Sequence, residues 1–308
     1  MEIHADFAEW LRFSHLLGSL GDYQKEQSLK AGEERSYQKM LTLQMIQFFP
    51  LQWLSLSMIS SAVWAKHFEL GYMTPLLYPV IHQNLHGNFD NVSQEVNATV
   101  LIPGIAKVYV SFFADEMEMS DIGRFFSNPR NMIALQAGVK APIPFLPLSL
   151  FTVQYTKIEP FVYAHYPEED SPFFSTSVDM SYTHDGENLG FPLPPNSDEL
   201  LVKASSFFLP GMGASLSCRL VRHGTNPDEA GETAIYGDID KWFNYDLVAS
   251  YPDKVFLRDG FYDINHIVTL EGFIFFKGVP LCLSAQYSMV HRSWLVSGSG
   301  LPKPDDRV

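Results

Sequence analysis

The feature that most limits what this chain can fold into is the alternation of short and long connections between stretches with a two-residue hydrophobic period. The short connections hold Pro or Gly and lie at 50–51, 103–104, 141–147, 210–212 and 277–278. The long connections are 17–37, 65–94, 116–130, 159–198 and 223–262. A soluble β-sandwich mixes long and short loops, whereas an outer-membrane barrel has short periplasmic turns and long outside loops. The order of the turns therefore predicts an all-β fold, an antiparallel, up-and-down transmembrane β-barrel of the outer membrane.

One hairpin, residues 200–223, shows the two faces that such strands must have. Side chains in a strand point alternately to opposite faces. In its second strand one face holds Ala214, Leu216, Cys218 and Leu220, and the other holds Ser215, Ser217 and Arg219. The turn at 209–213 contains one proline and two glycines, so the chain can reverse there. A barrel in lipid turns the apolar face outward, and the polar face then lines a wet lumen.

The same pattern predicts about eleven strands, each near the roughly 9 to 11 residues that cross a bilayer with tilt. They are placed at 7–16, 38–49, 53–64, 95–102, 105–115, 131–140, 148–158, 199–208, 213–222, 263–275 and 280–291. No Ser/Gly/Pro-rich linker divides the chain, so residues 1–308 are interpreted as one barrel domain. Closed single-chain barrels of bacteria have an even number of strands. The odd count, and a start without a signal peptide, predict a domain that is incomplete at both ends.

The composition fits this prediction and excludes other classes of protein. The chain is 14% aromatic and 18% charged with a mean hydropathy of −0.03, as expected when each strand has one apolar and one polar face. A net charge of −14 argues against nucleic acid as a partner. The apolar stretch from Leu41 to Ala65 contains Pro50 and many Gln and Ser residues, which makes it too polar for a membrane-spanning helix. Cys218 and Cys282 fall on non-adjacent predicted strands, so we expect no disulfide.

Three pairs of phenylalanines come just before short connections. They are Phe48-Phe49, Phe207-Phe208 and Phe275-Phe276. In an outer-membrane barrel such residues form an aromatic girdle at one membrane interface. In a soluble barrel the same pairs are core residues, and this alternative stays open.

No motif in the sequence indicates catalysis. His184-Asp185 lies near serines at 175, 177 and 181, but a nucleophile elbow is absent, so an outer-membrane lipase or esterase is a weak alternative. A glycosidase with paired carboxylates is a second weak alternative. It is weak because runs of charged residues in loops are usually only solvated. No metal-ligand motif fits the spacing of the four possible ligands His82, His86, Asp90 and His165. We therefore expect a protein that is not an enzyme and that has no cofactor and no metal.

Two of the long connections are rich in aromatic, His, Asn and Asp residues. Aromatic faces stack on sugar rings, and amides and carboxylates bind hydroxyl groups, so such loops suit a glycan. The candidate polysaccharide-binding residues are Trp64, Tyr72, Tyr78, His82, Asn84, His86, Asn88, Asp90, Tyr163, His165, Tyr166, Tyr182 and His184. The alternative, equally well supported, is that these residues pack together and partly plug the lumen. The segment Met73–Gln83 is too apolar for a free loop and is expected to fold inward.

A set of short motifs is spread between residues 38 and 290, at Lys39–Met45, Gly87–Asn91, Val96–Gly104, Tyr109–Asp115, Gln154-Tyr155, Tyr163–His165, Gly190–Leu200 and Arg222–Gly224. In these stretches the chain resembles the Wzi family of capsule-assembly outer-membrane proteins. The resemblance implies a large antiparallel barrel that acts as a surface lectin and holds capsular or exopolysaccharide on the cell. It also implies an export signal, a periplasmic helical bundle and closing strands, which this sequence does not show.

The expected protein is thus a monomeric barrel with long extracellular loops and a partly plugged lumen, in the outer membrane of a Gram-negative (diderm) bacterium. Its expected partners are capsular or exopolysaccharide and outer-membrane lipid, and nucleic acid is not among them. A passive porin-like channel shares every barrel feature and remains the alternative function. An outer-membrane hydrolase is the less favoured one.

Overall fold

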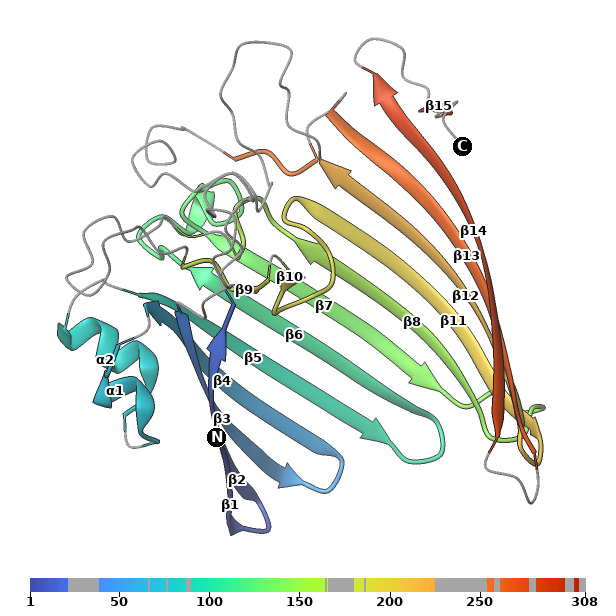
Figure 1. The fold of residues 1–308 in the computed structure, drawn as a ribbon, viewed down its shortest axis with the longest axis horizontal. Coiled ribbons are helices and arrows are strands. Elements are labelled where there is room, and N and C mark those ends of the chain that lie inside the picture. The colour runs from blue at the N-terminus through green and yellow to red at the C-terminus, as the bar shows by residue number, and fades with distance from the viewer. Residues whose placement is uncertain are drawn as a thin grey trace, which may run out of the picture.

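The computed structural model describes residues 1–21, 39–65, 67–75, 77–86, 90–163, 165, 180–185, 187–224, 254–257, 261–276, 281–296 and 302–304. Within them, thirteen strands form one sheet (Figure 1). They are β1 (Glu2–Ala8), β2 (Leu11–Leu20), β3 (Lys39–Leu51), β4 (Leu54–Ala65), β5 (Asn91–Ile102), β6 (Ala106–Glu116), β7 (Met132–Ala141), β8 (Ser149–Ile158), β11 (Ser197–Leu209), β12 (Met212–Gly224), β13 (Phe261–Phe275), β14 (Cys282–Val296) and β15 (Pro302–Pro304). A separate two-stranded sheet holds β9 (Thr183–His184) and β10 (Glu187–Asn188). The helices are α1 (Leu70–Met73), α2 (Pro79–His86) and the 3-10 turn η1 (Ile122–Arg124).

The long strands pair in the order in which they follow one another in the chain. The order is β1 to β8 and then β11 to β15, and every pairing is antiparallel, so the sheet is an up-and-down meander. Short connections lie at one end of the sheet and long ones at the other (Figure 1). This arrangement confirms the fold class predicted from the order of the turns. No helix in the described ranges is both long and apolar enough to cross a membrane.

The N-terminal part differs from the single strand predicted over 7–16. It forms two strands, β1 and β2, which are joined by a tight turn at Glu9-Trp10 with Ala8 opposite Leu11. A two-residue turn without Pro or Gly leaves no turn signal in the sequence, so periodicity alone joins the two strands into one. The predicted count of eleven is therefore wrong, because twelve long strands and the short β15 make up the described sheet.

The hairpin β11–β12 has the register that its alternation predicts. Ala204 lies opposite Leu216, and Lys203 lies opposite Ser217 on the other face. Gly211 takes a positive φ of 81° in the turn, a conformation that glycine adopts without steric cost. A Cβ at this position would also lie 2.9 Å from the backbone oxygen of Phe275. The turn thus needs glycine for its conformation and for space.

The sheet has an apolar outer face and a polar inner face. Residues that are paired directly across two strands share a face, so the registers assign each strand residue to one of the two. The outer face exposes large apolar side chains such as Val139 and Leu216, which are 41% and 48% exposed. Cys218 lies on the outer face and Cys282 on the inner face, and both are free thiols. An apolar outside and a polar inside are what a barrel in lipid requires.

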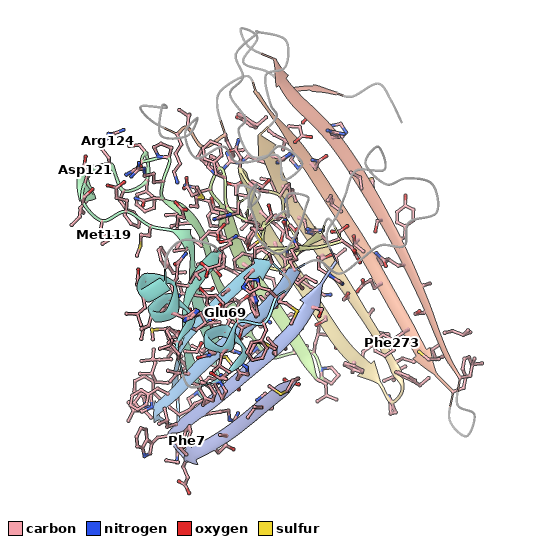
Figure 2. The ribbon with its side chains drawn as sticks, turned by 60° about the vertical axis from the view of Figure 1, so that its left-hand side comes forward. Phe7, Glu69, Met119, Asp121, Arg124 and Phe273 are labelled. Atoms are coloured by element: carbon pink, nitrogen blue, oxygen red, sulfur yellow. The ribbon has the colours of Figure 1, made fainter. Side chains whose placement is uncertain are left out.

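Aromatic side chains gather at the end of the sheet that carries the short turns. Trp10 packs edge-on against Phe48 with ring centroids 5.7 Å apart, and Phe207 packs in the same way against Phe273 at 5.1 Å. Figure 2 marks Phe273 on the C-terminal side of this end. Phe48 shares the outer face with its partner Leu56 and is exposed, as a residue of an interface girdle would be, whereas Phe273 and Phe275 have their partners Gly213 and Cys282 on the inner face.

Two clusters of buried residues lie at the end with the long connections, one on each face. On the inner face one cluster includes Val63, Phe113 and Tyr163. On the outer face the other includes Ala62 and Trp64, and here α1 and α2 lie against β4 and β5. The inner cluster belongs to a segment that covers part of the lumen wall, and the outer cluster belongs to a helical cover.

The prediction that Met73–Gln83 folds inward is wrong. Gln44, which shares the outer face with its partner Ser60, donates hydrogen bonds to the backbone oxygens of Thr74 and Leu77 at 3.1 and 3.0 Å. Met73 and Val80 of this segment pack against the outer cluster, so these side chains are removed from water on the outer face and not in the lumen.

Candidate functional site

Four of the candidate glycan-binding residues pack together on the outer face. The ring of Tyr72 lies 5.1 Å from that of Trp64 and 4.4 Å from that of His82, measured between centroids. The Tyr72 hydroxyl donates a hydrogen bond to Asp90 Oδ2, and His82 Nε2 lies 3.1 Å from Glu69 Oε1. Trp64, Tyr72, His82 and Asp90 are all buried. In this position they hold the helices on the sheet.

The other candidates of the same connection lie around this cluster. Tyr78 is half-buried, and burial raises the pKa of its hydroxyl to about 12. Asn84 is exposed on α2. His86 ends α2, but its side chain is not among those described, and Asn88 lies outside the described residues, as does Tyr166 of the second connection.

Two candidates of the second connection, Tyr163 and Tyr182, lie on the inner face. Tyr163 and Tyr182 stack with ring centroids 6.3 Å apart, and the Phe113 ring lies 5.4 and 5.9 Å from them. Both hydroxyls have a raised pKa, because burial disfavours the tyrosinate. His165 is also buried and donates its backbone N–H to Ser181 Oγ at 3.2 Å, but its side chain lines a pocket with Val80 of α2 and Gln94 of the outer face. The contacts of the two tyrosines are those expected of a partial plug of the lumen, which was the alternative to a glycan-binding surface.

We call the described residues 160–163, 181–185 and 187–195 the inner segment, because strand side chains fix it to the inner face. Lys39 Nζ donates to the Ser181 backbone oxygen at 2.9 Å and to Thr183 Oγ1 at 3.1 Å. The Asp115 carboxylate accepts the Tyr163 backbone N–H at 2.9 Å. The Phe191 N–H donates to Tyr163 Oη at 3.0 Å, which closes the segment on itself. The segment thus occupies part of the lumen at the end with the long connections.

His184 takes part in fixing the inner segment. Its Nδ1 accepts the backbone N–H of Gly21 at 2.8 Å, and its Nε2 lies 3.7 Å from Asp185 Oδ2. The serines at 175 and 177 that a hydrolase would use lie outside the described residues. Ser181 Oγ accepts the His165 N–H, as above. The described contacts of His184 are therefore those of a structural residue.

A recess of about 230 Å³ lies in the inner wall next to the inner segment. Its lining is mostly polar and consists of Glu95, Asn97, Thr99, Lys107, Tyr109, Val110, Ser111, Gln136, Lys140 and Phe191. Lys107 and Lys140 are directly paired across β6 and β7. The Lys140 ammonium lies 5.5 Å from the centroid of the Tyr109 ring, in cation–π geometry. Phe191 brings the inner segment to this recess, which we call the lumen recess.

Tyr109 lies across β7 toward β8 because Gly138 leaves it room. Its hydroxyl donates to Gln154 Oε1 at 2.7 Å. A Cβ at Gly138, its direct partner in the register, would lie 2.4 Å from the Tyr109 hydroxyl oxygen. Alternation in the sequence places Lys107 and Tyr109 on the lumen side. It singles out neither Gly138 nor Phe191, since a glycine in a strand and a phenylalanine in a long loop give no specific signal.

Farther along the inner wall, charged residues occur mainly as ion pairs. Arg219 pairs with Glu199 through short contacts, and Arg292 Nη2 lies 2.7 Å from Asp263 Oδ2. Lys203 Nζ lies 3.6 Å from Glu271 Oε2. In the described part of the chain, the ammonium groups of the lumen recess have no carboxylate within ion-pair distance. The recess therefore holds two lysines that form no direct ion pair within the described residues, with Glu95 as the one carboxylate in its lining.

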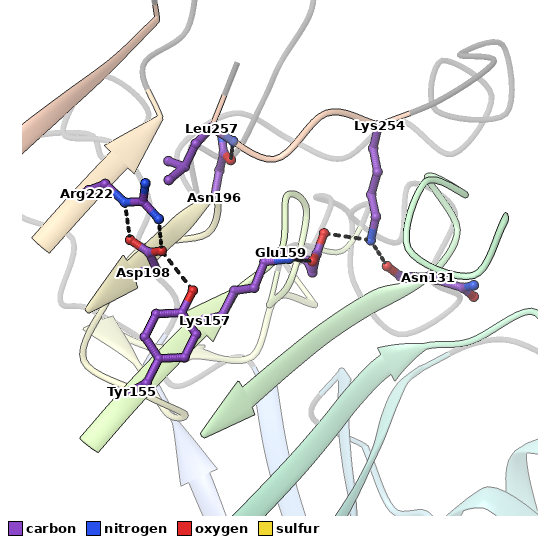
Figure 3. A network of polar contacts seen from close by, with 9 residues as sticks. All are labelled: Asn131, Tyr155, Lys157, Glu159, Asn196, Asp198, Arg222, Lys254 and Leu257. Carbon is purple, nitrogen blue, oxygen red and sulfur yellow. Dashed lines mark hydrogen bonds and ion pairs between the residues drawn. The ribbon is translucent and has the colours of Figure 1, made fainter. Parts of the chain in front are cut away.

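On the outer side, a second network ties the connection between β12 and β13 to the ends of β7 and β8 (Figure 3). Lys254 Nζ lies 3.3 Å from Glu159 Oε2 and donates to the Asn131 backbone oxygen. The Leu257 N–H donates to Asn196 Oδ1 at 2.9 Å. Burial lowers the pKa of Lys254, and the Glu159 charge offsets part of this effect. Four residues, 254–257, thus fix part of a long connection.

The described residues contain no group of three or more His, Cys, Asp or Glu side chains arranged to hold a metal ion.

The fold is similar to that of an outer-membrane porin. The crystal structure of Pseudomonas aeruginosa OccD3 (OpdP) superimposes with a TM-score of 0.50 over 96% of this chain and 63% of that one, at 10% sequence identity. The chain therefore spans less than two thirds of that protein. At this identity the likeness shows the fold alone, which is that of an outer-membrane β-barrel. No protein-family model matches the chain, and no curated protein matches it either.

Proposed function

We propose that this chain forms the wall of an outer-membrane channel through which small polar solutes diffuse, with its lumen narrowed by the inner segment. The observation that carries this proposal is the lumen recess, where Lys107 and Lys140 face an inner wall that is polar elsewhere too. A barrel that served only as an anchor would not need two lysines without ion-pair partners on its inner wall, next to the place where the inner segment narrows the lumen. The channel works without chemistry, so the protein is not an enzyme.

The burial of the candidate glycan-binding residues supports this choice of function. The rings of Tyr163 and Tyr182 contact Phe113, and those of Trp64 and Tyr72 pack against each other in a tilted arrangement. A sugar polymer stacks on exposed aromatic faces. With their faces already covered, these residues shape the lumen and the loops instead.

The charge of the lumen recess sets a preference among solutes. A unit charge at about 6 Å contributes about 0.7 kcal/mol in water, and more where protein walls replace part of the water. Two adjacent lysines, Lys107 and Lys140, therefore favour small anions over small cations at this level of the lumen. Glu95 lines the same recess and moderates this preference.

Reversal potentials in planar bilayers under a salt gradient test the proposal. The purified protein is expected to conduct with an anion preference, and Lys140→Glu is expected to shift the reversal potential toward cations. The double variant Lys203→Gln, Glu271→Gln is the matched control, because it removes both charges of an ion pair on the inner wall and leaves the net charge of the lumen unchanged. A protein that inserts but carries no current, or a Lys140→Glu variant with the same reversal potential as this control, contradicts the proposal.

The second candidate function is non-catalytic attachment of capsular or exopolysaccharide, with the protein as a monomer in a Gram-negative outer membrane. Its support is the likeness to the Wzi family and the polar, aromatic long connections. The exposed Asn84 and the half-buried His184 are the candidates that a polymer reaches first. Loss of surface polysaccharide from cells that lack the protein, with unchanged solute uptake, favours this function over the channel.

A further inference from the structure

The apolar outer face changes character in the middle of β3, β4 and β5. Toward the short turns it exposes Met58 and Val96, which are direct partners. Two residues farther along each strand come Ser60 and Gln94, and next to Ser60 lies Gln44. A polar side chain that faces lipid without a partner is costly, so these positions need a cover.

The helices α1 and α2, with the turn between them, supply this cover. The turn reaches Gln44, the sixth of the thirteen residues of β3, and the Gln44 amide donates to two of its backbone oxygens. Ser60 is fully buried and accepts a hydrogen bond from Gln94. Val80 of α2 packs against the cluster of Ala62 and Trp64. The helical pair, α1 and α2 with the turn between them, therefore covers the outer face at the level of the middle of β3. At this level an uncovered strand of the barrel would contact lipid.

The side of the helical pair that faces away from the sheet is apolar. Phe68 and Leu70 are 75% and 59% exposed, and Ile81 and Leu85 are 49% and 68% exposed. Ile81 and Leu85 are four residues apart, so they form one stripe on α2. Figure 2 shows the pair, marked by Glu69, in front of the N-terminal strands. A stripe of this kind on a polar loop in water would be a liability.

We propose that the helical pair is a membrane-interface element, and that acyl chains of the outer leaflet cover Phe68, Leu70, Ile81 and Leu85. The argument is continuity, because the stripe extends the exposed apolar surface that begins at Met58 and Val96. Asn84 and Glu69 lie among these residues, which suits the boundary between headgroups and chains. The helices cover the polar side chains of Gln44 and Ser60 on the strands and present apolar side chains to the lipid in their place.

Quenching by lipids brominated on their acyl chains tests this assignment in the full chain reconstituted into vesicles. Ile81→Cys and Leu85→Cys are labelled with a fluorophore in a Cys218→Ser, Cys282→Ser background. Val139→Cys on the bare outer face is the lipid-facing control, and Lys107→Cys in the lumen recess is the water-facing control. At both helix positions we expect at least about half of the quenching at Val139, as for side chains in the interface.

Two outcomes overturn the assignment. One is quenching at Ile81 and Leu85 no greater than at Lys107, together with full access to a water-soluble quencher. The other is an intermolecular disulfide that forms at Leu85→Cys but not at Val139→Cys, since a second copy of the chain then covers the stripe. Phe68→Cys serves as a further probe if a variant of α2 does not assemble. The channel proposal is measured by current and does not depend on this result.

Discussion

Substitution of Gly190 by alanine tests whether the inner segment is fixed by close packing. An added Cβ would lie 2.4 Å from Tyr163 Oη and 2.6 Å from Cε1, whereas ordinary contacts begin at 3.4 Å. The Tyr163 ring cannot move aside, because it is fully buried between Phe113 and Tyr182. The segment itself must therefore shift by about 1 Å.

The size of the effect follows from two contributions. Overpacking of a well-packed site costs about 1–3 kcal/mol. The shift also lengthens the hydrogen bond from the Phe191 N–H to Tyr163 Oη, now 3.0 Å, and its loss adds about 1 kcal/mol. We expect Gly190→Ala to lower the free energy of local opening of the inner segment by about 3 kcal/mol. The open lumen then carries a larger current.

Hydrogen exchange at the Phe191 amide, followed by mass spectrometry in detergent micelles, measures the opening free energy directly. Gly18→Ala is the matched control, because Gly18 is on the same inner face and its Cβ would meet no atom within 4 Å. That control is expected to stay within about 0.5 kcal/mol of the native protein. Equal exchange in the two variants refutes the packing argument.

Three further outcomes are expected. Burial raises the pKa of Tyr163 and Tyr182 in the folded protein, so their contribution to stability is complete below pH 10.0 and is lost as the pH rises above it. Unfolding midpoints measured below and above pH 10.0 are expected to show this loss. Gln44→Leu leaves two backbone oxygens of the helical pair without a donor and is expected to cost about 1–3 kcal/mol in urea unfolding. Glu159→Gln removes the counter-charge of the fully buried Lys254 and is expected to lower the free energy of unfolding by about 3 kcal/mol in the same measurement. For Gln44→Leu or Glu159→Gln, a free energy of unfolding equal to that of the native protein within error contradicts the contact concerned.

The strands could be predicted from the sequence because their signal is local. Alternation fixes which residues share a face, and the Pro and Gly turns fix where β11 and β12 reverse. The hairpin β1–β2 escapes this logic, since Glu9-Trp10 has no turn residue. Its two strands differ from one long strand only by a tertiary pairing.

The long connections could not be placed from the sequence, because their positions depend on distant contacts. The sequence shows that the connection with Tyr163 and Tyr182 is rich in aromatic residues and that Met73–Gln83 is apolar. It does not show on which face of the sheet these residues are buried. Lys39 fixes the inner segment from more than a hundred residues away. Gln44 likewise fixes the helical pair through two backbone oxygens, which no sequence pattern encodes.

The most direct test of the channel compares two neighbouring residues on opposite faces of β7. Lys140 lines the lumen recess, whereas Val139 is exposed on the outer face. Lys140→Cys and Val139→Cys, each in a Cys218→Ser, Cys282→Ser background, are treated with a bulky, charged thiol reagent during current recording in a planar bilayer. A polar lumen predicts a fall in current for Lys140→Cys and no change for Val139→Cys. An unchanged current for Lys140→Cys, or an equal fall for both, contradicts the account.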